Sequence, residues 1–170
     1  MATNRDTEWR RKLRDALPAK ERTSIPRATM PMLAADCRIR SNEEVNRGLS
    51  LEQACTEATR CLDCPDAQCV TGCPVGIDIP GFIKNIQRGC IAEAAAVLRR
   101  TSALPAVCGR VCPQERQCES KCIYNKMKKE PVAIGWLERF AADAERDLPE
   151  RPAPECAPRN GRKVAVAGSG

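Results

Sequence analysis

The 170-residue sequence contains no histidine and only five aromatic residues: two Trp, one Tyr and two Phe. Without an imidazole, this segment cannot build a Ser-His-Asp or Cys-His nucleophilic device, and it cannot ligate a Rieske centre. Aromatic rings normally supply much of the burial energy of a core. Their scarcity predicts that something else helps to fill the interior, and the missing histidine argues against a self-contained catalyst.

Export signals and long hydrophobic runs are also missing. The stretch MATNRDTEWRRKL has no apolar region and no small-residue cleavage site, and no uncharged apolar run is long enough to span a bilayer. We therefore expect a cytoplasmic protein with no membrane partner. In a reducing compartment clustered thiols typically serve metal or redox chemistry, so the twelve cysteines favour such a site over a disulfide framework.

The net charge of +6 is concentrated near the N-terminus, where residues 1–27 contain eight Lys or Arg and four Asp or Glu. Nucleic-acid-binding proteins typically combine a basic face with stacking aromatics or a known motif, and neither is evident in this sequence. We therefore expect no nucleic-acid partner and interpret the segment as a solvated amphipathic arm.

Composition and periodicity divide the chain into four parts. Residues 1–40 are expected to form an N-terminal helix, over residues 4–17, and an extended arm. Residues 41–147 show helical periodicity without strand alternation and are expected to be all-α. Proline-rich residues 148–161 are typical of a linker, and residues 162–170 begin a different kind of segment.

Helix boundaries in the central part carry recognisable signals. Ser50 followed by Gln53 is typical of a capping box. Asp78 is expected to cap a second helix, which Gly89 interrupts. Pro131 is expected in the first turn of a third amphipathic helix.

The final residues, GRKVAVAGSG, change character. Val164 to Ala167 is expected to form a short buried strand, and Gly168 and Gly170 follow it with one residue between them. A strand leading into G-x-G-x-x-G begins a dinucleotide-binding unit. Because the pattern stops after two glycines, we expect it to be the truncated start of such a domain in a longer protein.

Two groups of four cysteines stand close together in the sequence: Cys61, Cys64, Cys69 and Cys73, and then Cys108, Cys112, Cys118 and Cys122. The first group reads C-x2-C-x4-C-x3-C-P, which differs from the bacterial ferredoxin run C-x2-C-x2-C-x3-C-P only at the middle gap. Two four-cysteine sites would satisfy zinc equally well in number. Zinc ligands more often come as separated C-x2-C pairs, commonly with histidine, so we favour iron-sulfur clusters over zinc.

Four motifs together, EATRCLDC, CVTGCPVGIDIPGFI, LPAVCGRVCPQERQC and EPVAIGWLERFAAD, resemble a known module. They are similar to the N-terminal iron-sulfur domain of the small (beta) subunit of NADPH-dependent glutamate synthase. The same module occurs at the start of dihydropyrimidine dehydrogenase and in flavoprotein subunits of ferredoxin-NADP transhydrogenases. The resemblance covers roughly residues 40–170 and implies an α-helical ferredoxin-like domain with two 4Fe-4S clusters.

The resemblance also implies the ligands of each cluster. One cluster would be held by Cys61, Cys64, Cys69 and Cys122, and the other by Cys73, Cys112, Cys118 and Glu138. Glu138 lies in AIGWLERF, where dihydropyrimidine dehydrogenase has glutamine, and no Lys or Arg stands at positions 134, 135, 141 or 142 to pair with it. The spacing alone leaves Cys108 as an alternative ligand, because it forms a C-x3-C pair with Cys112.

In the family, NADPH reduces FAD in the domains that follow, and the clusters pass electrons to a flavin in a partner chain or domain. The resemblance therefore implies an electron-transfer module with no catalytic residue of its own. Gly168 and Gly170 would belong to the FAD-binding fold. The partner would be a large catalytic subunit or a downstream flavin domain. The alternatives are a structural zinc-binding adaptor and a stand-alone ferredoxin.

Overall fold

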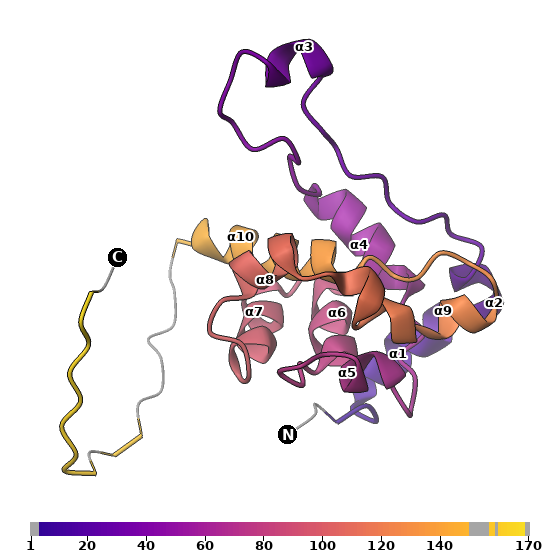
Figure 1. Cartoon of the computed structure of the whole chain (residues 1–170). Helices are drawn as coiled ribbons and strands as arrows, with labels where there is room; N and C mark the ends of the chain where they lie inside the picture. The colour runs from indigo at the N-terminus through magenta and orange to yellow at the C-terminus, as the bar shows by residue number, and fades with distance from the viewer. Residues whose placement is uncertain (1–3, 150–156, 159, 169–170) are drawn as a thin grey trace.

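The structure is a computed structural model, and it describes residues 4–149, 157–158 and 160–168. Within these ranges the chain is all-α, and its one β-bridge joins Met32 to Asn46 (Figure 1). No helix in the described ranges has the length and apolar character needed to cross a bilayer. The elements are α1 Glu8–Ala16, α2 Ala19–Arg22, α3 Ala35–Arg38, α4 Leu51–Arg60, α5 Gln68–Thr71, α6 Ile79–Gln87, α7 Ile91–Arg99, α8 Pro105–Val111, the 3-10 turns η1 Gln114–Arg116 and η2 Glu119–Lys121, α9 Ile123–Lys126 and α10 Ile134–Arg146.

The predicted capping signals of α4 and α6 are confirmed. The Ser50 hydroxyl accepts a hydrogen bond from the backbone N–H of Gln53, whose side chain accepts one from the N–H of Ser50. Asp78 caps α6 by accepting from the N–H of Gly81. Gly89 has φ +76°, a conformation that glycine adopts without a steric penalty, and it separates α6 from α7.

The helix that was expected to begin at Pro131 is α10, and it begins three residues later. It starts at Ile134 with Ala133 as its N-cap residue, so Pro131 lies before the helix. Tertiary hydrogen bonds occupy this stretch: the Pro131 carbonyl accepts from Arg60, and the Ala133 N–H donates to Glu57. The expectation of a first-turn proline was therefore wrong, because partners distant in sequence hold residues 131–133 outside the helix.

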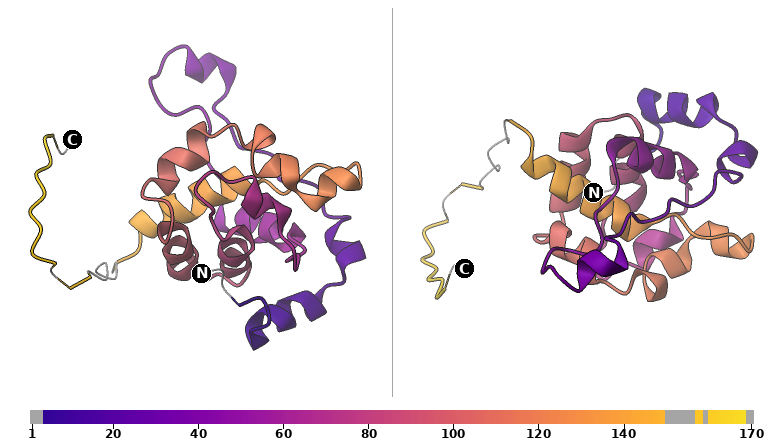
Figure 2. Two further views of the ribbon diagram at one scale, coloured as in Figure 1. Left: turned by 60° about the horizontal axis from the view of Figure 1, so that its bottom comes forward. Right: turned by 90° about the horizontal axis from the view of Figure 1, so that it is seen from above.

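The core is centred on α6, in which every residue from Ile79 to Ile86 is buried. Helices α4 and α7 pack against α6, and α10 packs against α6, α7 and α8 (Figures 1 and 2). Most of the buried apolar side chains are aliphatic, and the aromatic ones among the described residues are Phe82, Tyr124 and Phe140. Cys61 and Cys122 pack against this core, so the thiol-bearing loops border the interior.

The N-terminal arm is docked on the helical body, which corrects the interpretation of a solvated arm. The expected helix is present as α1, but its most buried side chain is an arginine. Arg10 in α1 and Arg22 in α2 are each only 2% exposed. The arm thus packs on the body through buried cations.

A hairpin-like excursion, residues 31–47, projects from the body and carries α3 (Figure 1). Backbone hydrogen bonds close its base: Leu33 N–H donates to the Val45 carbonyl, and Arg47 N–H donates to the Pro31 carbonyl, both at 2.8 Å.

The strand expected at Val164 to Ala167 is not formed. These residues have no assigned secondary structure, and Val164 and Val166 are 86% and 80% exposed. A β-strand needs a neighbour for its backbone hydrogen bonds, and the described residues supply none here. Gly168 has φ +82°. Most of the predicted linker and Gly170 lie outside the described residues.

Candidate iron-sulfur site

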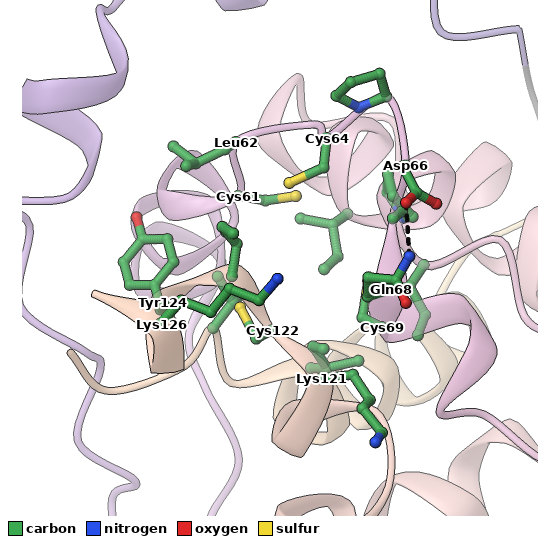
Figure 3. A pocket seen from close by; sticks show the side chains of 18 residues that line it. Cys61, Leu62, Cys64, Asp66, Gln68, Cys69, Lys121, Cys122, Tyr124 and Lys126 are labelled. Carbon is green, nitrogen blue, oxygen red and sulfur yellow. Dashed lines mark hydrogen bonds between the residues drawn. The ribbon is translucent and has the colours of Figure 1, made fainter. Parts of the chain in front are cut away.

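The structure brings four of the predicted ligands, Cys61, Cys64, Cys69 and Cys122, around one cavity of about 310 Å³. Cys61 is the C-cap residue of α4, Cys69 lies in α5, and Cys122 lies between η2 and α9. Figure 3 shows Cys61 and Cys64 on one side of the cavity and Cys122 on the other. The grouping of Cys122 with three cysteines more than 50 residues earlier in the sequence is therefore a property of the fold.

The remaining predicted ligands form a second neighbourhood. Cys112 is the C-cap residue of α8, and its thiol interacts electrostatically with Glu138 and Cys73. Cys118, between η1 and η2, interacts with the same two side chains. Packing of α10 on α8 and of α5 on η2 produces this arrangement.

The carboxylate of Glu138 is buried, and one of its oxygens has no hydrogen-bond partner among the described residues. Its residue is only 6% exposed, and burial raises the pKa of the carboxyl to about 7. Its Oε1 is buried and accepts no hydrogen bond from any of the described residues. A buried carboxylate oxygen without a hydrogen bond is costly, and a bound cation would remove that cost.

Burial and mutual repulsion raise the pKa of several of these thiols when no metal is bound. Burial raises the pKa of Cys64 to about 11, with repulsion from Cys61 and Cys122 adding to it. Burial also raises the pKa of Cys69 and raises that of Cys118 to about 12. Since thiolates bind metals, loading these sites must release protons, and the metal supplies the positive charge that makes their release favourable.

The four thiols of Cys61, Cys64, Cys69 and Cys122 surround a cavity. No three Cys, Asp or Glu side chains in the described part of the chain converge closely enough to hold a lone metal ion. A tetrahedral zinc site with Zn–S bonds of about 2.3 Å needs its sulfurs within about 4 Å of one another. Thiols spread around a cavity fit a multi-atom cluster better, and the donor set therefore fits an iron-sulfur group.

Cys108 also stands close to this second neighbourhood. Burial and the neighbouring Cys108 thiol raise the pKa of Cys112 to about 11, and the Cys108 Sγ lies 3.9 Å from the Ser102 hydroxyl oxygen. The tempting C-x3-C pair is thus a spatial pair, and the geometry by itself leaves Cys108 beside Glu138 as a candidate fourth donor.

Sequence reasoning missed the buried charges behind the first cavity. Asp63, between the first two cysteines, is fully buried with φ +55°, and it forms ion pairs with Arg10 and Arg14 of α1. Lys84 of α6 donates to the Cys61 carbonyl, as does Arg22. No sequence signal distinguishes these cations from solvated ones. The sequence shows the acid within C-x2-C, but only the fold shows that the arginines of α1 pair with it.

Comparisons with known proteins identify the family of this chain. The family model for dihydropyrimidine dehydrogenase domain II, described as a 4Fe-4S cluster domain, matches residues 38–149. UacF of Escherichia coli (strain K12) is 37% identical over 175 residues, which cover 100% of this chain and 27% of UacF. The glutamate synthase [NADPH] small chain of the same strain is 40% identical over 127 residues, 75% of this chain and 27% of that protein.

A third relative is the NAD-dependent dihydropyrimidine dehydrogenase subunit PreT of the same strain, 43% identical over 93 residues, 55% of this chain and 22% of PreT. The chain thus spans about a quarter of the length of these relatives. The family match extends from the hairpin through α10 and includes both groups of thiols. The resemblance seen in the sequence is confirmed, and the chain belongs to the family of 4Fe-4S domains represented by domain II of dihydropyrimidine dehydrogenase and found in glutamate synthase small chains.

Proposed function

We propose that this chain is the electron-transfer module of an NADPH-dependent flavoprotein oxidoreductase of the glutamate synthase small-chain type, with two 4Fe-4S clusters. The observation that carries the proposal is the presence of two donor groups. One is the four-thiol cavity, and the other joins three thiols to a buried carboxylate oxygen with no hydrogen bond.

Each donor group would hold one cluster. Cys61, Cys64, Cys69 and Cys122 would ligate the first, and Cys73, Cys112, Cys118 and Glu138 the second. A bound 4Fe-4S cluster supplies one-electron redox chemistry that side chains cannot provide. The protein binds it through thiolates, encloses it against the core, and gives the second site one harder oxygen donor, which should make the two reduction potentials differ.

The names of the relatives support a nicotinamide cofactor as the source of the electrons. The names of two of them specify a nicotinamide cofactor, NADPH for the glutamate synthase small chain and NAD for PreT. We infer that FAD and NADPH bind in domains beyond this segment, with Gly168 and Gly170 at the start of the FAD-binding fold. A large catalytic subunit or a downstream flavin domain would accept the electrons. No residue of this segment would form a bond to substrate.

The test is anaerobic iron quantification with EPR spectroscopy on wild type and Glu138→Ala. We expect about eight irons per wild-type chain, from two four-iron clusters, and a changed or missing signal from one cluster in the variant. Glu93→Ala, at an exposed helical glutamate, is the matched control. Cys108→Ser examines the rival donor and should leave both signals intact.

The outcomes separate the alternatives. A colourless protein with zinc and no iron would establish the adaptor function instead. Wild-type spectra in Glu138→Ala together with an altered signal in Cys108→Ser would transfer the fourth ligand to Cys108. An open reading frame that ends shortly after Gly170 would favour a stand-alone ferredoxin.

A further inference from the structure

The loop that carries Cys61 and Cys64 is covered by the basic N-terminal segment, residues 5–22, hereafter the N-terminal clamp. Arg14 donates to Asp63 Oδ2 at 2.6 Å, and Arg5 donates to the Asp63 carbonyl at 2.6 Å. Arg10 pairs with the Asp63 carboxylate through two nitrogens. Both the side chain and the backbone of the residue between the cysteines are therefore bound by the clamp.

The conformation of this loop is not one that an aspartate adopts freely. Asp63 has φ +55°, a left-handed conformation that non-glycine residues avoid unless local contacts hold them there. Its carboxylate is also fully buried, which is strongly unfavourable without paired cations. The arginines of the clamp offset both costs, so the loop and the clamp stabilise one another.

Further cations reach the Cys61 carbonyl from two sides. Arg22, at the end of the clamp, donates to it at 3.3 Å and also donates to the Leu17 carbonyl at 2.8 Å. Lys84 donates to the same carbonyl from α6. The C-x2-C loop is thus held by side chains from the clamp and from the core, with several positive charges and one negative charge behind the first cavity.

We propose that the N-terminal clamp is a positioning element for the first cluster: through Asp63 it holds the Cys61–Cys64 loop ready to ligate, and its charges set the reduction potential at that cavity. Docking of the clamp and loading of the cavity are then linked, so each favours the other. This inference depends on the proposed cluster site. It assigns a function to residues before the segment that the family model matches.

Variants of Arg10 and of Asp63, the two partners of the ion pair, distinguish this proposal from a purely structural role of the clamp. Arg10→Gln and Asp63→Asn both break the pair, so both should release iron from the first cluster to an Fe(II) chelator roughly tenfold faster than wild type. Asparagine tolerates positive φ, so Asp63→Asn removes the charge without changing the backbone preference.

The reduction potentials should move in opposite directions. Reduction adds negative charge, so losing the Arg10 cation should make the potential of the first cluster more negative, and losing the Asp63 anion should make it more positive. The expected change is on the order of tenfold in the reduction equilibrium for each unit charge. Redox titration followed by EPR measures both, on the full chain purified anaerobically.

Arg11→Gln is the matched control, because Arg11 is the next residue of the same helix, is exposed, and carries the same charge. It should release iron at the wild-type rate. If Arg10→Gln unfolds the segment, Arg14→Gln, at a side chain that is 15% exposed, replaces it in the same assay.

Limited trypsin digestion measures the effect of cluster loading on docking of the clamp. Arg11, Lys12 and Lys20 are exposed cleavage sites within the clamp. Removing iron should accelerate cleavage there, because detachment of the clamp exposes the backbone. Cleavage that does not depend on iron content, or potentials that shift in the same direction in both variants, would overturn the inference. If anaerobically purified wild-type protein contains no iron, the proposed function itself is refuted.

Discussion

Helices α8 and α10 approach each other closely at Gly109, and filling that position should damage the second donor group selectively. An ideal Cβ on Gly109 would lie 2.5 Å from the backbone N of Arg139 and 2.8 Å from its Cα. Neither atom belongs to a side chain that could rotate away. Gly109→Ala therefore requires α8 to move away from α10.

The size of the effect follows from two opposing terms. Overpacking a tight interior costs about 1–3 kcal/mol, and the upper end applies because the obstacle is backbone. Replacing glycine by alanine inside a helix gains about 1 kcal/mol. The net loss is about 2 kcal/mol in the free energy of unfolding. For a chain of this length that lowers Tm by about 4–8 °C.

The functional consequence depends on where the ligands lie. Cys112 follows α8, and Glu138 belongs to α10, so displacing the helices separates these two donors. We expect Gly109→Ala to lose or alter the EPR signal of the second cluster while the first cluster is retained. Anaerobic thermal unfolding followed by circular dichroism gives the stability.

Val107→Ala serves as the control, since Val107 lies in the same helix with a 48% exposed side chain. This change raises helix propensity without crowding α10 and should leave Tm and both EPR signals near wild type. Unfolding of Gly109→Ala at or above the wild-type temperature, with both signals intact, would refute the packing account.

Two further predictions concern buried and exposed carboxylates. Glu57 accepts from two backbone N–H groups and one guanidinium, so Glu57→Gln should lose about 3 kcal/mol of unfolding free energy in denaturant titration, whereas the exposed Glu52→Gln should not. The hydrogen bond from Arg110 lowers the pKa of Glu44, so the attachment of the hairpin, residues 31–47, is stabilised when Glu44 is ionised and weakens as the pH falls below its ordinary value of 4.5. We measure the hydrogen-exchange rates of the hairpin amides and divide them by the intrinsic exchange rates at each pH. The corrected rates should rise in acid for wild type and change little with pH in Glu44→Gln.

Local signals were sufficient for the starts of α4 and α6 and for the break between α6 and α7. The capping box at Ser50, the cap at Asp78 and the interruption at Gly89 were all predicted correctly because short-range hydrogen bonds and backbone preferences decide them. The cysteine spacing and motifs also identified the family. These features depend on residues within a few positions of one another, which a sequence displays directly.

Other features required the fold because their partners are distant in sequence. Pro131 lies before α10 since Arg60 and Glu57 bind the preceding backbone, and residues 164–167 form no strand without a neighbour. Likewise, the sequence shows Arg10 and Arg14 on an amphipathic helix, but it does not show that both side chains form ion pairs with the buried carboxylate of Asp63.

The sequence by itself determined the all-α class, because capping and helical periodicity act over short distances, and its four motifs identified the family by resemblance. The resemblance to the family implied which thiols belong together, and only the tertiary structure decided that Glu138 is buried without a hydrogen bond and that the basic arm is docked on Asp63. Burial and long-range pairing depend on how helices pack, and packing places together residues that the sequence separates by more than 40 positions.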